Sequence, residues 1–414
     1  MYDLIVIGGG ASGLMAAGRA AELGARVLVL EKNKRVGEKL RISGGGRCNI
    51  TNAEPDPRVL LRAYGKAEQF LYSLFAQFGV KDTFTFFESR GLPLVVQARQ
   101  RAFPKSEKAA DVVNTLLAYT KKGNVTIKTS AAVTRVHSGP SGIEGVSVGA
   151  ETYQAKNYLF ATGSVSHPET GSSGDGFAWL RTLGHTVRKP TPTIVPLSVK
   201  EEWVKRLAGV SMAGMKITFF VEGVKAFAES GKVLFTHFGV SGPLILNSAH
   251  KVADLLHDGA VTATIDAYPK VDLGALEKKI LATFDANKNK TLKNVLKEFI
   301  PEGTTAGIAH LVGAEIDINK KVHLVSKEER KRLASLLKAL PLTINGLMGF
   351  DRAVVADGGV PLSEVDMRTM QSKKIPNLYL TGDLLDINRP SGGYSLQLCW
   401  SSGFVAGTHS AKQN

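Results

Sequence analysis

The chain has 414 residues, of which 43% are hydrophobic and 21% are charged, and its formal net charge at pH 7 is +15. This length exceeds that of one ordinary domain, and the composition excludes a disordered chain. The two cysteines, Cys48 and Cys399, exclude a disulfide framework and a C-x-x-C redox pair. Because no apolar run reaches the length of a membrane span and no signal-peptide pattern precedes the first strand, we expect a cytoplasmic protein that does not bind membranes.

A dinucleotide-binding unit is predicted at residues 3–31. The apolar run 3–7 is typical of a buried parallel strand, and a Gly-x-Gly-x-x-Gly motif follows it directly with Gly8, Gly10 and Gly13. An Ala-rich helix and a second apolar strand complete the unit. In such a unit the first glycine permits a tight turn, the second admits a pyrophosphate, and the third allows close helix packing.

Glu31 stands at the end of the second strand. A carboxylate at this position accepts hydrogen bonds from ribose hydroxyls and disfavours the 2′-phosphate of NADP. Ala11 and Ser12 open the helix, whose N-terminal N–H groups and dipole attract phosphate. The unit therefore predicts a bound dinucleotide other than NADP.

A glycine loop follows at residues 41–52, where Gly44, Gly45 and Gly46 stand between Arg41 and Arg47. Glycines let backbone N–H groups approach a ligand closely, and arginines suit phosphate or another electron-rich group. Because this loop comes just after the dinucleotide unit, we expect it to contribute to the cofactor site.

Two later strand ends favour FAD as the dinucleotide. The apolar run 377–383 leads into Gly-Asp, which fits the fingerprint in which an aspartate binds the ribityl chain. The run 158–163 ends in Ala-Thr-Gly, as strands of two-dinucleotide-fold flavoproteins do. A glycine turn at residues 391–397 then leads into a helix of small residues.

The predicted fold class is α/β, with a discontinuous, Rossmann-like two-dinucleotide-fold FAD domain at residues 1–190 and 341–414. Prolines punctuate the sequence from residue 190, and short alternating runs beyond them indicate antiparallel strands. Lysine-rich helical stretches follow at about 273–300 and 326–340. We therefore expect an inserted substrate domain, partly β-barrel-like and partly helical, at residues 191–340.

Motifs spread over nearly the whole chain resemble those of the YhiN/BaiN-type flavoproteins, also called aminoacetone-oxidase-like FAD proteins. These motifs are Ser43–Asn52, Phe103–Ser106, Thr170–Gly176, Thr236–Pro243 and Gly392–Tyr394. The resemblance implies that Arg47, Cys48 and Asn49 lie beside the flavin and that Glu31 binds the adenosine ribose. The chain departs from the family pattern at Asp383 and Ser395, where the family more often has Glu and Asn.

The expected cofactor-binding residues belong mostly to strand ends and glycine turns. They are Gly8, Gly10, Ala11, Ser12, Gly13, Glu31, Lys32, Lys39, Gly45, Gly46, Arg47, Cys48, Asn49, Val133, Thr162, Gly163, Gly382, Asp383, Gly392, Gly393 and Tyr394. No metal site is expected. Because a second complete nucleotide fingerprint is missing, either NADPH or NADH visits the flavin transiently as hydride donor, or the electrons come from elsewhere.

The basic charge has two interpretations, namely lysine faces exposed to solvent or an acidic macromolecular partner such as RNA. Basic residues concentrate near residues 32–41, 99–105, 288–297 and 327–332, and no RRM or KH signature is present. The resemblance favours RNA, because the family includes enzymes that reduce a uridine C5=C6 bond in ribosomal RNA. Other members act on steroid-type enones or small amines.

The leading function predicted is reduction of a conjugated C=C bond by hydride from reduced flavin, with a uridine of 23S ribosomal RNA as substrate. A proton donor is also needed, and the candidates are Cys48, His237 and Tyr394. Each of these has a simpler structural role as its alternative. Two other functions stay open: a small-molecule enone reductase or amine oxidase, and a non-catalytic flavin-containing RNA-binding or assembly factor.

Overall fold

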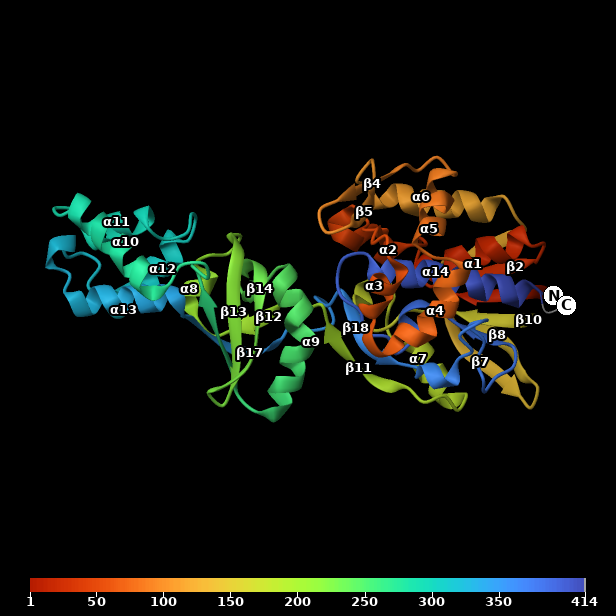
Figure 1. The fold of residues 1–414 in the computed structure, drawn as a ribbon. Coiled ribbons are helices and arrows are strands. Elements are labelled where there is room, and N and C mark those ends of the chain that lie inside the picture. Colours follow the sequence, from red (N-terminus) through yellow and green to blue (C-terminus); the bar gives the residue numbers. More distant parts are fainter. Residues whose placement is uncertain (413–414) are drawn as a thin grey trace. The chain divides into compact units, whose positions relative to one another are not determined.

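The computed structural model describes residues 1–412 and divides the chain into two compact units. The first comprises Met1–Pro192 and the chain from Val354 onward, and the second comprises Thr193–Ala353 (Figure 1). The second unit is therefore an insertion into the first. Within residues 1–412, no helix combines the length and the apolarity needed to cross a membrane.

A five-stranded parallel sheet forms the centre of the first unit, in the order β19-β10-β1-β2-β6. Its strands are β1 (Tyr2–Ile7), β2 (Val27–Leu30), β6 (Val125–Lys128), β10 (Ala155–Phe160) and β19 (Leu378–Leu380). Ile7 pairs with both Leu30 and Phe160, and Phe160 pairs with Leu380. The last residues of these strands are therefore in register, so that the carboxyl ends of the strands form one edge of the sheet. Doubly wound folds bind ligands at this edge.

Two helices from opposite ends of the chain, α1 (Ala11–Glu22) and α14 (Tyr394–Lys412), lie side by side in the first unit (Figure 1). Glycines permit the close approach of their backbones. A Cβ at Gly403 would lie 2.4 Å from Ser12 O, and a Cβ at Gly407 would lie 2.4 Å from Ala16 O. Helix α6 (Ala109–Lys121) also packs against α1.

Smaller elements complete the first unit. The short sheets are β3-β5-β4 (Thr51–Asn52, Arg101–Pro104, Leu94–Gln97), β7-β8-β9 (Val133–Gly139, Gly142–Val148, Glu151–Tyr153) and β11-β18 (Arg188–Thr193, Val355–Gly359). The further helices are α2 (Glu38–Ile42), α3 (Pro57–Arg62), α4 (Glu68–Gln77), α5 (Val80–Glu88) and α7 (Asp175–Thr182).

The second unit contains a closed six-stranded barrel in the order β12-β15-β14-β13-β16-β17. Its strands are β12 (Leu197–Val199), β13 (Ser211–Val221), β14 (Val224–Thr236), β15 (Gly239–Ser241), β16 (Val261–Asp266) and β17 (Leu340–Leu347). Phe219, Phe235 and Ile265 are completely buried in the barrel core. The predicted α/β class and the barrel-like part of the insertion are confirmed.

Helices form the rest of the second unit. They are α8 (Glu202–Lys205), α9 (Pro243–Asp258), α10 (Leu273–Ala286), α11 (Leu292–Val295), α12 (Thr305–Gly313) and α13 (Lys327–Lys338). Helix α9 packs on the barrel, whereas α10 to α13 share a core of their own that includes Leu276, Ile280 and Leu333.

In the sequence, the second compact unit ends at Ala353 and the first resumes at Val354. This boundary lies 13 residues beyond the one that we expected at residue 340. Pro341 lies inside β17, where it pairs with Thr264 of β16. Because β17 also pairs with β12, this strand closes the barrel. Residues 341–353, which we assigned to the FAD domain, therefore belong to the second compact unit.

Candidate cofactor site

The predicted dinucleotide motif forms a turn between β1 and α1. Gly8 has φ +105°, and a Cβ there would lie 2.4 Å from Ala161 O at the end of β10. A Cβ at Gly13 would lie 2.0 Å from Gly8 O, so only glycine lets α1 start this close to the strand. Gly10, by contrast, has no heavy atom within 4 Å of its Cβ position. The backbone at Gly10 and the first turn of α1 are thus open to a phosphate group.

Glu31 directly follows β2 and is buried, with 7% of its surface exposed. Its Oε2 accepts a hydrogen bond from Gly9 N at 2.8 Å, and its Oε1 accepts one from Asn33 N at 2.8 Å. Ala131 N donates to Glu31 O at 2.9 Å, and β7 begins two residues later at Val133. Glu31 and Val133 are thereby brought to the same part of the sheet edge as the glycine turn.

Lys32 and Lys39 both form ion pairs near this edge. Lys32 Nζ lies 2.7 Å from Asp175 Oδ2, at the start of α7. Lys39 Nζ lies 3.3 Å from Asp383 Oδ2 and donates to Ser166 Oγ at 2.5 Å. The ammonium group of Lys39 therefore lies beside the strand end of β19.

The glycine loop contains a short 3-10 turn, Ser43–Gly46, whose Gly45 and Gly46 have φ +67° and +83°. No heavy atom lies within 4 Å of the Cβ position of either glycine. Arg47 follows, with its guanidinium carbon 4.6 Å from the centroid of the Phe103 ring and its Nη1 3.3 Å from Glu107 Oε1. The loop thus presents open backbone beside a fixed cation.

Two asparagines of the glycine loop hold the later glycine turn. Asn49 accepts a hydrogen bond from Gly393 N at 3.0 Å when its amide oxygen faces that turn. Asn52 Nδ2 donates to Gly392 O at 3.1 Å. The structure therefore brings the motifs at residues 41–52 and 391–397 together, although more than 300 residues separate them in sequence.

Arg389 belongs to this cluster, and sequence reasoning missed it. Its buried guanidinium pairs with Asp383, and its Nε donates to Ser395 Oγ at 3.1 Å. Burial favours a raised pKa for the Asp383 carboxyl, but the charges of Arg389 and Lys39 outweigh it and lower that pKa. Asp383 and Ser395, the two departures from the family pattern, therefore both contact Arg389.

The three candidate proton donors have different surroundings. Cys48 is completely buried, and burial raises the pKa of its thiol to about 12 against the opposing effect of a hydrogen bond with Ser43. It lies in an apolar cluster, so we do not propose it as an acid. His237 lies in the second unit, in the turn between β14 and β15, with its ring 4.9 Å from that of Phe238.

Tyr394 is the first residue of α14 and is partly buried. Its ring meets that of Tyr64 edge-on at 5.6 Å, and its carbonyl oxygen accepts a hydrogen bond from Tyr64 Oη at 2.9 Å. Burial raises the pKa of the Tyr394 phenol, and the negative charge of Glu54 adds to this effect. The phenol therefore stays protonated at neutral pH and is able to donate a proton.

The arrangement fits an FAD molecule lying along the sheet edge. From β2 to β19 the edge carries the Glu31 carboxylate, an open glycine turn, and the residues Thr162–Gly163 and Gly382–Asp383 that follow β10 and β19. Within residues 1–412, the buried atoms Thr162 Oγ1 and Arg41 Nε have no hydrogen-bond partner. Buried polar atoms are normally paired, so these two are suited to a polar ligand.

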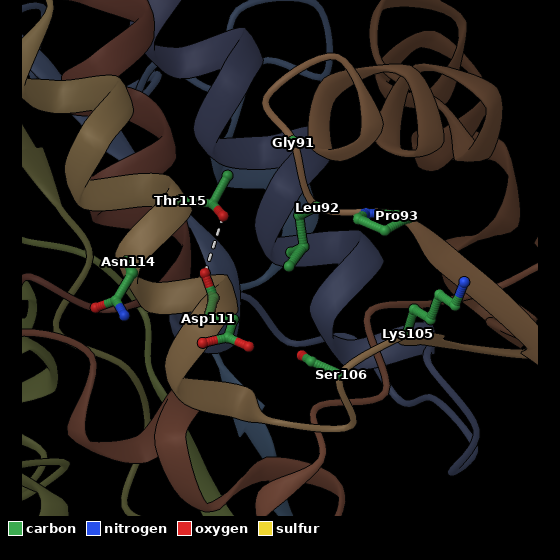
Figure 2. A pocket seen from close by; sticks show the side chains of 8 residues that line it. All are labelled: Gly91, Leu92, Pro93, Lys105, Ser106, Asp111, Asn114 and Thr115. Atoms are coloured by element: carbon green, nitrogen blue, oxygen red, sulfur yellow. Dashed lines mark hydrogen bonds between the residues drawn. The ribbon is translucent and has the colours of Figure 1, made fainter.

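A separate hollow of about 410 Å³ lies in the first unit, between α6 and the loop that follows β5 (Figure 2). Its lining residues are Gly91, Leu92, Pro93, Lys105, Ser106, Asp111, Asn114 and Thr115. None of the expected cofactor-binding residues lines it, whereas Lys105 and Ser106 come from the Phe103–Ser106 motif.

Comparison with known proteins identifies the family. A family model described as HI0933-like protein Rossmann domain matches residues 2–409. The chain belongs to this family. The 3-dehydro-bile acid delta(4,6)-reductase of Clostridium scindens is 30% identical to it over 100% of both chains. The ribosomal RNA dihydrouridine synthase of Escherichia coli is 29% identical over 98% of this chain and 96% of the relative.

Solved structures agree on the fold. The 3-ketosteroid-delta4-(5alpha)-dehydrogenase from Rhodococcus jostii RHA1 matches 100% of this chain and 97% of its own, with a TM-score of 0.54 and 16% identity. This likeness shows the fold alone. The resemblance to YhiN/BaiN-type flavoproteins is confirmed, and the family supports FAD as cofactor and an oxidoreductase activity.

Proposed function

We propose that this member of the HI0933-like family is an FAD-dependent reductase that converts a uridine of 23S ribosomal RNA to dihydrouridine. The observation that carries the proposal is similarity over nearly the whole chain to the ribosomal RNA dihydrouridine synthase of Escherichia coli. The formal net charge of +15 supports an anionic substrate. We further propose NADPH or NADH as the transient hydride donor.

The chemistry is conjugate reduction of an electron-poor double bond. Bound FAD in its reduced form would supply the hydride, which adds to uracil C6. The protein must then donate a proton to C5 and fix the base in place. The phenol of Tyr394, protonated at neutral pH and next to the Gly392–Gly393 turn, is the acid that we propose. His237 is the second candidate for this role.

Arg47 is suited to positioning. Its guanidinium is held between the Phe103 ring and the Glu107 carboxylate, beside the open backbone of Gly45 and Gly46. A cation fixed in this way binds an electron-rich oxygen of flavin or substrate without a further loss of side-chain freedom. Asn49 and Asn52 act on the site indirectly, because they hold the turn that precedes Tyr394.

Reduction of a conjugated enone is the second candidate function. The full-length similarity to the bile acid reductase of Clostridium scindens favours it. Both candidates use the same addition of hydride and proton to a C=C bond conjugated with a carbonyl. They differ in substrate size and charge, because an enone of steroid type does not need the basic surface.

Mapping of dihydrouridine in 23S ribosomal RNA from a strain lacking the gene tests the proposal. We expect one dihydrouridine to disappear and to return when the wild-type gene is supplied, but not with a Tyr394→Phe variant. An unchanged dihydrouridine pattern would refute the proposed substrate. In parallel, NAD(P)H oxidation by the purified holoenzyme is measured with a 3-keto-Δ4 steroid, and rapid turnover there would favour the second candidate.

A further inference from the structure

We propose that four basic residues of the β4–β5 hairpin and of the loop between β5 and α6, namely Arg99, Arg101, Lys105 and Lys108, form the surface that binds the phosphodiester backbone of the RNA. We call this set the cationic hairpin. The inference rests on the proposed function, since it names the surface by which an RNA substrate would reach the same site.

The charges of the cationic hairpin are available to a ligand. Arg99, Lys105 and Lys108 are exposed, and Arg101 is partly exposed. Within residues 1–412, none of the four has a carboxylate oxygen within 4.0 Å of its charged nitrogen atoms; the nearby acid Glu107 pairs instead with Arg47. An unpaired cation at the surface gains more from a phosphate than one that must first leave an ion pair.

The hairpin is fixed rather than free. Its turn carries Arg99 and Gln100 with φ of +63° and +56°, and Arg101 Nε donates to Ala98 O at 3.0 Å. Ala53 N donates to Gln100 O at 2.6 Å, which ties the turn to the end of the glycine loop. The backbone that carries Arg99 and Arg101 therefore has a defined position on the first unit.

One side chain links this surface to the candidate flavin site. Asn52 Nδ2 donates both to Arg99 O at 3.3 Å and to Gly392 O at 3.1 Å. The side-chain amide of Asn52 thus bridges the hairpin turn and the Gly392–Gly393 turn. A strand whose phosphates lie on Arg99 and its neighbours would present an unstacked base to the site next to Tyr394, as enzymes that act on single bases require.

Another basic cluster, on the second unit, lacks these properties. Lys288 Nζ lies 4.0 Å from Asp285 Oδ1, and Lys290 Nζ lies 3.7 Å from Glu298 Oε1. The sequence shows this cluster, which includes Lys293, as one of four concentrations of basic residues, and residues 99–105 are another. Because Lys288 and Lys290 already pair with acidic residues, the cluster serves as the control, and the test removes three cations from each surface.

The test compares two triple variants of the FAD-loaded protein. One is Arg99→Gln/Lys105→Gln/Lys108→Gln, and the other is Lys288→Gln/Lys290→Gln/Lys293→Gln. Binding of a fluorescein-labelled, uridine-containing single-stranded RNA is measured by anisotropy over a range of salt concentrations. We expect the hairpin variant to bind about tenfold more weakly or worse, and its salt slope to fall by about 2, since each lost phosphate contact removes about 0.7.

The control variant should bind within about twofold of wild type. The inference is overturned if the hairpin variant keeps wild-type affinity and slope, or if the control variant loses as much. It is also overturned if polyglutamate competes as well as unlabelled RNA, because the surface would then suit an acidic polypeptide. A charge-conserving variant, Arg99→Lys/Lys105→Arg/Lys108→Arg, should retain binding, which separates loss of charge from loss of folding.

These outcomes are distinct from failure of the proposed function. Anisotropy does not depend on turnover, and the flavin absorbance of each variant reports that the cofactor site is intact. If gene deletion leaves dihydrouridine unchanged while the hairpin variant binds RNA more weakly, the proposed substrate is refuted but the proposed RNA-binding surface is supported. If deletion removes dihydrouridine while the hairpin variant binds RNA as the wild type does, the proposed function is supported and the proposed RNA-binding surface is refuted.

Discussion

Alanine substitutions at two adjacent glycines, Gly392 and Gly393, should have unequal effects. Both residues have positive φ, +118° and +105°, so an alanine at either position costs about 1–3 kcal/mol in backbone strain. A Cβ at Gly392 would lie 3.7 Å from Tyr394 Cε2 and 3.8 Å from Asn52 Nδ2, which are ordinary contacts. A Cβ at Gly393 would lie 2.2 Å from Thr51 C and 2.5 Å from Asn52 N.

These two close atoms belong to the backbone and cannot rotate away, so Gly393→Ala must displace the turn from β3. Overpacking of this kind adds about 1–3 kcal/mol to the backbone strain. We therefore expect Gly393→Ala to lower the free energy of unfolding by about 2–6 kcal/mol in total, and Gly392→Ala by about 1–3 kcal/mol. The displaced turn should also lose its hydrogen bonds with Asn49 and Asn52 and retain less FAD.

Urea unfolding followed by tryptophan fluorescence measures the first effect, and flavin absorbance after gel filtration measures the second. Gly392→Ala is the matched control, because it shares the strain without the clash. Equal unfolding free energies and equal FAD contents for the two variants would refute the reasoning from the packing of Gly393.

Three further predictions concern buried or partly buried polar groups. Arg389→Met leaves the buried Asp383 with Lys39 as its remaining cation, and should cost about 3–5 kcal/mol in thermal or urea unfolding; an unchanged midpoint would contradict the pairing. Tyr394→Phe should slow dihydrouridine formation by about 10²–10⁴-fold with FAD content unchanged, whereas wild-type rates would leave His237 as the acid. Burial lowers the pKa of His185, which bonds Glu364 Oε2 at 2.8 Å. Because the unfolded histidine takes up a proton below about pH 6.5, stability should be complete above that pH and fall as the pH drops below it. His185→Asn should flatten this dependence in urea midpoints measured between pH 5 and 8.

The sequence predicted the parts of the fold that local patterns determine. The strand, glycine motif and helix at residues 3–31 were readable because their spacing alone requires a turn at Gly8 and a close contact at Gly13. The end of the insertion was not readable, since Pro341 has the local appearance of a boundary. Its place in β17 depends on pairing with β12 and β16, which come from distant parts of the chain.

The same distinction applies to the candidate site. Arg389 was missed because it stands between two motifs, and its role depends on an ion pair that only the folded chain creates. A lone arginine between Asn388 and Pro390, close in sequence to Asp383, was the available signal. Cys48 was considered as an acid because its motif is flavin-like, but its complete burial is a property of the tertiary packing.

The sheet order has a consequence for how the protein is made. β1 and α1 are synthesised before the inserted unit, whereas β19, which completes their sheet, and α14, which covers α1, are synthesised after it. During translation of the inserted unit, the glycines that bring α14 against α1 do not yet exist. Until α14 has been synthesised, the face of α1 that it covers in the folded unit therefore lacks its packing partner.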